Sequence, residues 1–173
     1  CLVGSEMCIR DRRMVSLKPN GFQITLPDWW PPTFNESKNF ILGMQEVVED
    51  IYMILYNPPH AKVLLSLEEI SLLKQSVQNL VGIKCAGGDK QWYSQRRELL
   101  DDFSVFVPGH TVVYGKPLGA NGSYSNVACL SPNGAVKIWD LIEKDYKKAQ
   151  ELEAKVLNFM KQYILPFANK LSN

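Results

Sequence analysis

The sequence predicts an α/β fold in which short parallel strands alternate with amphipathic helices. Two observations indicate it: five short, mostly apolar segments each precede a segment with helical spacing, and turn residues separate the units. Continuous apolar strands are typical of a parallel sheet covered by helices. A doubly wound dinucleotide-binding sheet is the competing fold. It needs a glycine-rich phosphate turn, and Gly87-Gly88 lacks that spacing, so a (β/α)8-type arrangement is favoured.

The first unit begins with a predicted strand over 22–26, which ends at a proline-rich loop. A helix is predicted over 39–49, with Asn35 or Ser37 as its N-cap. The second strand is predicted over 51–56. It ends before two prolines, because proline has no N–H to donate to a strand ladder.

The second helix is predicted from 67 to 77 behind a capping box. Ser66 is a good N-cap, and Glu69 stands three residues later, where its carboxylate can reach back to the cap. The third strand, 80–84, ends on a lysine before a glycine-rich turn. A helix follows from about 89 or 91 to 100.

The last part of the chain completes the alternation. Strands are predicted at 103–107 and 122–125, with a short helix at 112–118 between them. Two longer helices follow, one from Pro132 to about 143 and one from Asp145 to about 164.

Composition narrows the class of protein. The chain has 173 residues, enough for one domain with a substantial core, and its net charge of +1 offers no attraction to nucleic acid or anionic membranes. No segment has the character of a membrane span or a secretory signal. The four cysteines fit neither a zinc site nor a disulfide framework, and two histidines do not favour a histidine-based metal site. We therefore expect a reduced, cytoplasmic protein that holds no metal and binds neither nucleic acid nor membrane.

Residues 1–13 are expected to be foreign to the fold. They show neither helical nor strand periodicity, and they resemble the translated adapter of a sequencing library, a known contaminant at read ends. A native N-terminal tail is the alternative. On the adapter interpretation, residues 14–173 are an incomplete domain that is truncated at both ends.

Two side chains at strand ends are the candidate catalytic residues. In a (β/α)8 barrel, chemistry takes place where strands end and βα loops begin. Lys84 ends the third strand, where burial disfavours the ammonium and makes a free amine available to attack a carbonyl. Tyr56 ends the preceding strand and can relay protons over short distances. The alternatives are a lysine that extends into solvent and a tyrosine that plugs the barrel top.

Three motifs resemble one enzyme family. They are Leu55-Tyr56-Asn57-Pro58-Pro59, then Val81-Gly82-Ile83-Lys84 with its lysine twenty-eight residues after the tyrosine, then Gly119-Ala120-Asn121-Gly122-Ser123-Tyr124-Ser125-Asn126. In this order, over about residues 20–165, the chain resembles the dihydrodipicolinate synthase / N-acetylneuraminate lyase family.

The resemblance implies a partial (β/α)8 TIM barrel whose five strands correspond to strands 4–8 of the complete barrel. It implies a class I aldolase or lyase, usually a homotetramer, that uses no metal and no organic cofactor. Lys84 would form a Schiff base with pyruvate or another 2-oxo acid, Tyr56 would relay protons, and an aldehyde would be the other substrate. Gly109, His110 and Tyr124 would face the substrate. The family's glycine–threonine–threonine motif, which holds the substrate carboxylate, has no counterpart in this chain.

Several positions depart from the named activities of that family. The synthases carry an arginine five residues after the tyrosine, where this chain has Ala61, and the adjacent Lys62 is expected to face away. Asp28 and Trp29 replace a tyrosine pair. After Gly109, where the sialic-acid lyases typically have acidic side chains, this chain has His110, Thr111 and Val112. A catalytically silent, ligand-binding family member is therefore the alternative function. A half barrel alone has unpaired edge strands, so we expect it to be inactive and poorly soluble or oligomeric.

Overall fold

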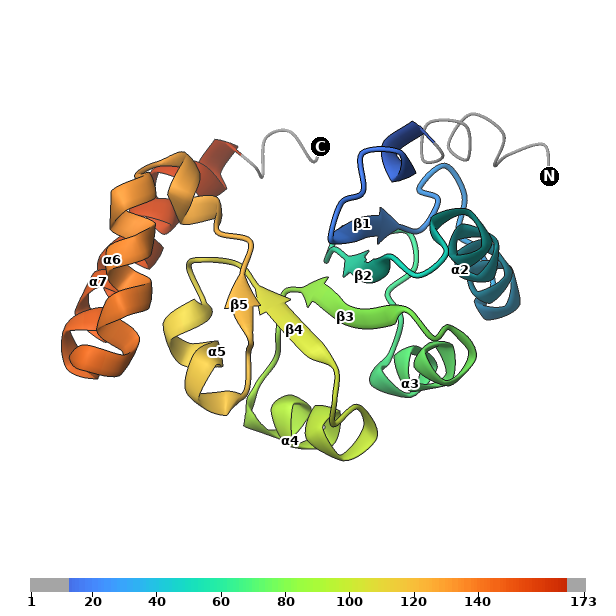
Figure 1. Cartoon of the computed structure of the whole chain (residues 1–173). Helices are drawn as coiled ribbons and strands as arrows, with labels where there is room; N and C mark the ends of the chain where they lie inside the picture. Colours follow the sequence, from blue (N-terminus) through green and yellow to red (C-terminus); the bar gives the residue numbers. More distant parts are fainter. Residues whose placement is uncertain (1–12, 168–173) are drawn as a thin grey trace. The chain divides into compact units, whose positions relative to one another are not determined.

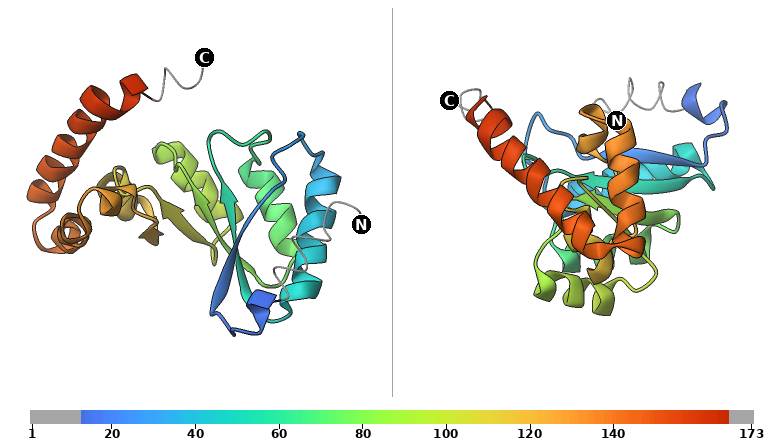
Figure 2. Two further views of the ribbon diagram at one scale, coloured as in Figure 1. Left: turned by 90° about the horizontal axis from the view of Figure 1, so that it is seen from above. Right: turned by 90° about the vertical axis from the view of Figure 1, so that its left-hand side faces the viewer.

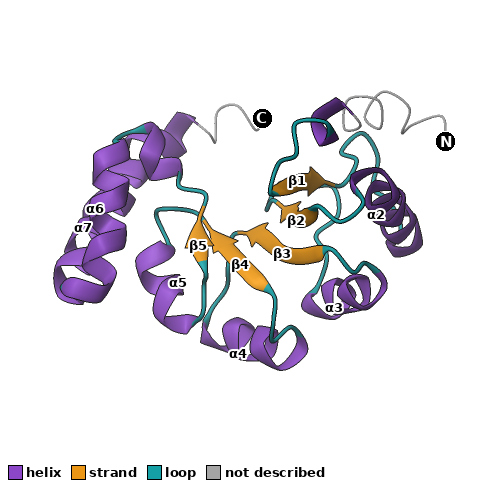
Figure 3. Cartoon of the chain, in the orientation of Figure 1, coloured by secondary structure: helices purple, strands orange, loops and turns teal. Residues whose placement is uncertain are grey.

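The structure is a computed structural model that describes residues 13–167 (Figure 1). The chain forms two compact units that divide between Ser104 and Val105. Strands and helices alternate along it (Figure 3). The strands are Gly21–Thr25 (β1), Tyr52–Asn57 (β2), Leu80–Cys85 (β3), Ser104–Val107 (β4) and Gly122–Ser123 (β5). The helices are Phe34–Val48 (α2), Leu67–Ser76 (α3), Lys90–Leu99 (α4), Val112–Leu118 (α5), Pro132–Lys144 (α6) and Tyr146–Phe159 (α7), with a 3-10 turn at Asn126–Cys129 (η1) and a π-helical turn at Met160–Ile164 (η2).

The segment 1–13, which the sequence predicts to be foreign, lies outside the described residues except for Arg13. Within residues 13–167, no helix combines the length and the hydrophobicity that crossing a membrane requires.

In the first unit, β1, β2 and β3 pair in chain order, and both pairs are parallel, as predicted. The register places Thr25, Tyr56 and Lys84 side by side, so the carboxyl ends of the three strands meet at one edge. Helices α2 and α3 lie on one side of these strands (Figure 2). The core of this unit is made of apolar side chains that are at most 3 % exposed, among them Ile41, Met44, Met53, Leu55, Ile70 and Leu73.

The two faces of β2 differ in burial, because successive side chains of a strand point to opposite sides. Met53, Leu55 and Asn57 are buried, whereas Tyr56 lies on the other face and is only half-buried. Lys84 is the register partner of Tyr56 and therefore shares its face. The lysine, one residue before the end of β3, thus lies on the face away from the helices, which in a closed barrel is the interior.

The start of α2 differs from the prediction. The sequence predicts Asn35 or Ser37 as the N-cap, but Thr33 caps the helix, which begins at Phe34. Thr33 Oγ1 accepts a hydrogen bond from the Glu36 N–H at 3.3 Å, and the Glu36 carboxylate accepts one from the Thr33 N–H at 2.7 Å. The prediction is wrong because this reciprocal box satisfies two end amides, whereas a single cap side chain satisfies one.

The cap predicted at Ser66 is confirmed, and α4 begins within the range predicted for it. Ser66 Oγ accepts from the Glu69 N–H at 3.2 Å, and the Glu69 carboxylate accepts from the Ser66 N–H at 2.9 Å. At the start of α4, Asp89 Oδ1 accepts from the Trp92 N–H at 2.8 Å. Both helices therefore begin where the local sequence predicts.

In the second unit, β4 and β5 are parallel and pair through Phe106 with Gly122 and Val107 with Ser123. The predicted strand 122–125 is too long, because β5 ends at Ser123. Beyond it the chain runs close to the loop after β4: a Cβ placed on Gly109 would overlap the Ser125 side chain. This close approach takes the chain out of the strand direction and into η1.

Helices α6 and α7 start as predicted. Ser131 Oγ accepts from the Gly134 N–H at 3.1 Å, and Asp145 Oδ1 accepts from the Lys148 N–H at 3.1 Å. The predicted helix from 145 to 164 is present, but its last turn widens into the π-helical η2.

Candidate active site

Lys84 and Tyr56 are brought together at the ends of β3 and β2. The lysine Nζ lies over the tyrosine ring, 3.9 Å from its centroid. Both side chains are half-buried. The quadrupole of an aromatic ring attracts a cation placed over its face, so this contact helps to hold the lysine beside the phenol. The two residues that the sequence singles out for catalysis therefore share one site.

An irregularity in the strand pairing sets this arrangement. Met53 pairs with Leu80, but the next residue, Ile54, pairs with Gly82, so the register shifts by one residue between them. Because side chains alternate along a strand, a one-residue shift exchanges the faces that meet. Downstream of the shift, Lys84 lies beside Tyr56.

Asn57 fixes the loop that follows Tyr56. Its Nδ2 donates to the Leu65 carbonyl at 3.2 Å, and its Oδ1 accepts from the Leu65 N–H at 3.3 Å. Both residues are buried, so these two bonds satisfy backbone groups that water cannot reach. Asn57 belongs to the motif behind the family resemblance, but the sequence analysis assigns it no role. The sequence pattern that could have marked Asn57 is an asparagine at a strand end, directly before two prolines.

A cavity of about 90 Å3 lies beside Tyr56. Polar groups on its wall come from Thr25, Asp28 and His60. Lys62, which is expected to face away, also lines this cavity. Thr25 is the register partner of Tyr56 and was missed in the sequence, because nothing in its local pattern marks it.

Cys85 follows Lys84 but lies on the opposite face of β3. It lines a separate cavity of about 190 Å3, together with apolar side chains such as Ile70, Ile83 and Trp92. Burial raises the pKa of the Cys85 thiol, against smaller opposing effects of the Gly87 backbone and the Arg96 charge. The thiol is therefore protonated at neutral pH and does not compete with Lys84 as a nucleophile.

The second unit contains the three residues predicted to face the substrate. Gly109 is buried close to the Ser125 side chain, and the Nδ1 atom of His110 lies 3.1 Å from Asn126 Oδ1. The structure thus brings the loops after β4 and β5 together. Tyr124 is 42 % exposed, and its ring meets Phe106 edge to face at 5.3 Å between centroids.

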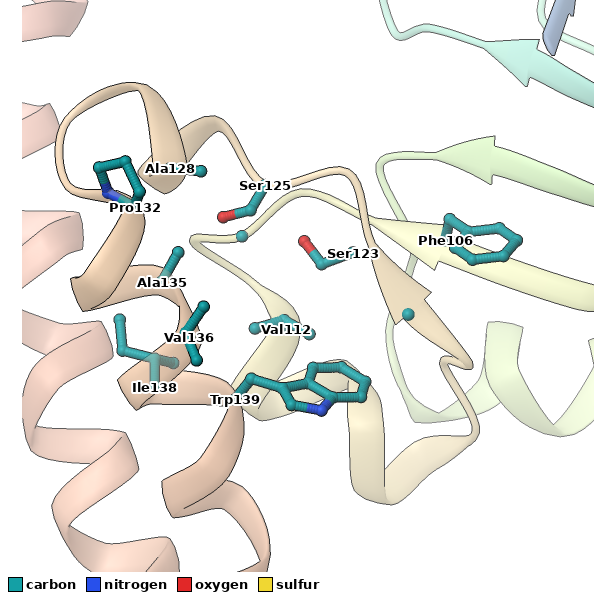
Figure 4. A pocket seen from close by; sticks show the side chains of 12 residues that line it. Phe106, Val112, Ser123, Ser125, Ala128, Pro132, Ala135, Val136, Ile138 and Trp139 are labelled. Atoms are coloured by element: carbon teal, nitrogen blue, oxygen red, sulfur yellow. The ribbon is translucent and has the colours of Figure 1, made fainter.

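A larger cavity, of about 590 Å3, lies in the second unit (Figure 4). Its wall includes Gly109, the Ser123 and Ser125 hydroxyls and the Trp139 ring, and otherwise consists mainly of apolar groups. None of its lining residues in the described chain carries a carboxylate, amine or imidazole. The size of this cavity suits a ligand, but its side chains do not provide acid–base chemistry.

Among residues 13–167, no group of three histidine, cysteine, aspartate or glutamate side chains is arranged to hold an ion.

The comparison with known families agrees with the strand-end geometry. The model of the Dihydrodipicolinate synthetase family matches residues 20–171. The chain belongs to this family. A search of curated proteins found no match. The family resemblance predicted from the three motifs is therefore confirmed.

Solved structures of dihydrodipicolinate synthetase relatives share the fold. N-acetylneuraminate lyase from Fusobacterium nucleatum matches with a TM-score of 0.78 and 18 % identity, over 91 % of this chain and 54 % of that chain. Dihydrodipicolinate synthase from Aquifex aeolicus gives 0.78 and 20 %, over 89 % and 54 %. A catalytic lysine mutant of the Ruminococcus gnavus sialic acid aldolase gives 0.81 and 13 %, over 93 % and 54 %.

These identities are low, so the likeness establishes the fold alone. The chain spans about half the length of the structures that it matches. The predicted α/β fold, part of a (β/α)8 barrel of the dihydrodipicolinate synthetase type, is confirmed.

Proposed function

We propose that this chain carries the Schiff-base machinery of a class I aldolase or lyase that acts on pyruvate or a related 2-oxo acid. The observation that carries the proposal is the position of Lys84 Nζ, 3.9 Å from the centroid of the Tyr56 ring at adjacent strand ends. Membership of the dihydrodipicolinate synthetase family supports it. The chemistry needs an amine nucleophile with a proton relay at short range, and this pair supplies both.

The reaction starts when the neutral amine of Lys84 adds to the keto carbon and forms a carbinolamine. Loss of water gives a protonated imine, which withdraws electrons from the neighbouring carbon. That carbon then loses a proton to form an enamine, or loses an aldehyde in the cleavage direction. The enamine attacks an aldehyde in the synthetic direction, and water finally releases the product and the free lysine.

Tyr56 is proposed to carry protons during these steps. Carbinolamine formation and dehydration each need a proton moved over a short distance, and the phenol is the side chain next to the amine. Gly109, His110 and Tyr124 are proposed to face the aldehyde portion of the substrate, as the family resemblance implies. His110 and Tyr124 offer an imidazole and a phenol for hydrogen bonds to hydroxyl groups.

The parent protein is proposed to act in the cytoplasm as a homo-oligomer, without metal or organic cofactor. The oligomer is what the family resemblance implies, and the free thiols of Cys85 and Cys129 are compatible with a reducing compartment.

Borohydride trapping tests the proposal. The full-length parent protein is incubated with pyruvate and sodium cyanoborohydride, and the adduct is located by peptide mass spectrometry. We expect modification of Lys84, loss of that adduct in K84R, and slower trapping in Y56F. Exposed lysines away from this site, such as Lys147 on α7, serve as internal controls for nonspecific reductive amination. A cooperatively folded protein that is modified no faster at Lys84 than at Lys147 would overturn the proposal.

A catalytically silent, ligand-binding member is the second candidate. Ala61 on the wall of the cavity beside Tyr56 favours it, because the synthases are expected to carry an arginine at this position. Saturation-transfer NMR with pyruvate separates the two functions. Pyruvate binding without any Lys84 adduct would identify the binding protein, whereas an adduct identifies the Schiff-base enzyme.

A further inference from the structure

The loop after β4, residues 109–111, is held by a helix that lies much later in the chain. Glu153 on α7 accepts a hydrogen bond through Oε1 from the Val113 N–H at 3.0 Å. The Tyr146 hydroxyl, also on α7, donates to the Val113 carbonyl at 3.3 Å. Two side chains of α7 therefore fix the first turn of α5, directly after this loop.

The short helix α5 needs this support. Val113 is its second residue, so the Val113 N–H has no acceptor within the helix. Thr111, the N-cap residue, makes no side-chain cap bond in the described part of the chain, because its Oγ1 donates back to the Pro108 carbonyl at 3.1 Å. Glu153 supplies from α7 the acceptor that a local cap normally provides.

The carboxyl group of Glu153 is half-buried, which is unfavourable for a charged side chain. Burial raises the pKa of this carboxyl, while bonds from the Val113 and Tyr114 backbone and the nearby His110 act in the opposite direction. Glu151 on the same helix stays exposed. Of these two glutamates of α7, the half-buried one is therefore Glu153, which accepts a hydrogen bond from α5.

The same helical segment is also linked to His110 indirectly, through Asn126. His110 Nδ1 lies 3.1 Å from Asn126 Oδ1, and Asn126 Nδ2 faces the sulfur of Met160 in η2 at 4.0 Å. With the Asn126 amide nitrogen facing sulfur, its oxygen faces the imidazole, so the proton belongs on Nδ1 of His110. Helix α7 and η2 thus contact the His110 loop through Glu153 and through Asn126.

We propose that Glu153 is a positioning residue for His110: by capping α5 from α7, it fixes the loop 109–111 and the orientation and tautomer of the imidazole that meets the aldehyde portion of the substrate. The inference rests on the proposed function for the role of His110 as a substrate-facing group. On this proposal, part of the specificity for the aldehyde substrate depends on α7, a helix that follows the last strand, β5.

Isotope-labelled chain allows the test by NMR, with variants E153A, E153Q and the matched control E151A. We expect hydrogen exchange of the Val113 amide to accelerate about tenfold in E153A, and to change little in E153Q, because the amide oxygen still accepts. Nitrogen spectra of the imidazoles should show a single Nδ1-protonated tautomer for His110 in the unsubstituted chain and in E153Q, and a mixture in E153A. His60 is the internal reference, and E151A should match the unsubstituted chain throughout.

Two results would overturn the inference. One is an E153A variant with unchanged exchange at Val113. The other is faster exchange without any change at His110, which would reduce Glu153 to a simple helix cap. If E153A does not fold, the E153Q variant decides: a folded E153Q with mixed His110 tautomers contradicts the inference, and a retained Nδ1 tautomer supports it.

Borohydride trapping at Lys84 in the full-length parent protein keeps the two proposals apart. A missing Lys84 adduct together with the expected His110 spectra would refute the proposed function alone. A Lys84 adduct together with a His110 nitrogen spectrum that does not change in E153A would refute the positioning role of Glu153 alone.

Discussion

Replacing Asn57 with alanine is expected to lower the free energy of unfolding by about 2–4 kcal/mol. The Asn57 side chain donates to the Leu65 carbonyl and accepts from the Leu65 N–H, at 3.2 and 3.3 Å. Asn57 is 9 % exposed and Leu65 is 5 % exposed, so little water can replace the lost partners. Each unpaired buried group costs about 1–3 kcal/mol, and two such groups with some relaxation of the loop give the stated range.

Thermal unfolding followed by circular dichroism measures this effect. For a chain of this size, the expected loss corresponds to a fall in Tm of roughly 5–15 °C. N35A is the matched control, because Asn35 is exposed on α2 and should shift stability by no more than about 0.5 kcal/mol. Equal Tm values for N57A and N35A would refute the claim that the Asn57–Leu65 bonds hold this loop.

The N57D variant checks the same reasoning through its pH dependence. At neutral pH the introduced carboxylate keeps the acceptor for the Leu65 N–H but faces the Leu65 carbonyl without a proton to donate. Burial and this carbonyl raise the pKa of the introduced group in the folded state, so the variant should regain stability as the pH falls and the group becomes protonated. A deficit relative to the unsubstituted chain that does not shrink at low pH would contradict this account.

Three further predictions follow from caps and close contacts. S66A should lose about 1 kcal/mol in urea unfolding, because it breaks the box with Glu69; an unchanged midpoint would contradict that role. G109A should lose about 1–3 kcal/mol through overlap with Ser125, and the double variant G109A/S125G should recover most of it in the same assay. Burial raises the folded-state pKa of Glu153, so the folded chain binds this proton more tightly than the unfolded chain; stability should therefore fall as pH rises from the unfolded pKa to the raised folded pKa. The E153Q variant should lack that fall, and parallel Tm–pH curves for the two chains would refute the prediction.

Local patterns predicted the elements well where one short-range interaction decides them. The capping box at Ser66 can be read from spacing alone, and α3 begins there, while the start of α4 at Lys90 lies within the range predicted for it. The cap of α2 was missed although the same pattern exists at Thr33, because the sequence offered Asn35 and Ser37 as competing caps. The end of β5 depended on a close approach to another loop, which no local pattern contains.

In the candidate site too, some residues could be predicted from the sequence and others could not. Tyr56 and Lys84 can be placed together from the sequence, because parallel strands bring their carboxyl ends to one edge and both residues are predicted to end strands. In the structure each is followed by one more strand residue. Thr25 shares this edge but carries no recognisable motif. The role of Glu153 could not be predicted from a local pattern, because Glu153 lies 40 residues from the Val113 amide that it caps. Its contact depends on how α7 packs.

The pairing register between β2 and β3 is the feature on which the proposed chemistry depends most. Met53 pairs with Leu80, and unbroken pairing from there would place Ile83 beside Tyr56 and Lys84 beside Asn57. The amine would then adjoin a buried amide on the helix-covered side of β2. The one-residue shift after Met53 instead makes Lys84 the register partner of Tyr56, and Cys85 the partner of Asn57. The apolar run before Lys84 fits either register, so the sequence predicts a strand that ends on a lysine, while the shift decides that its amine meets a phenol.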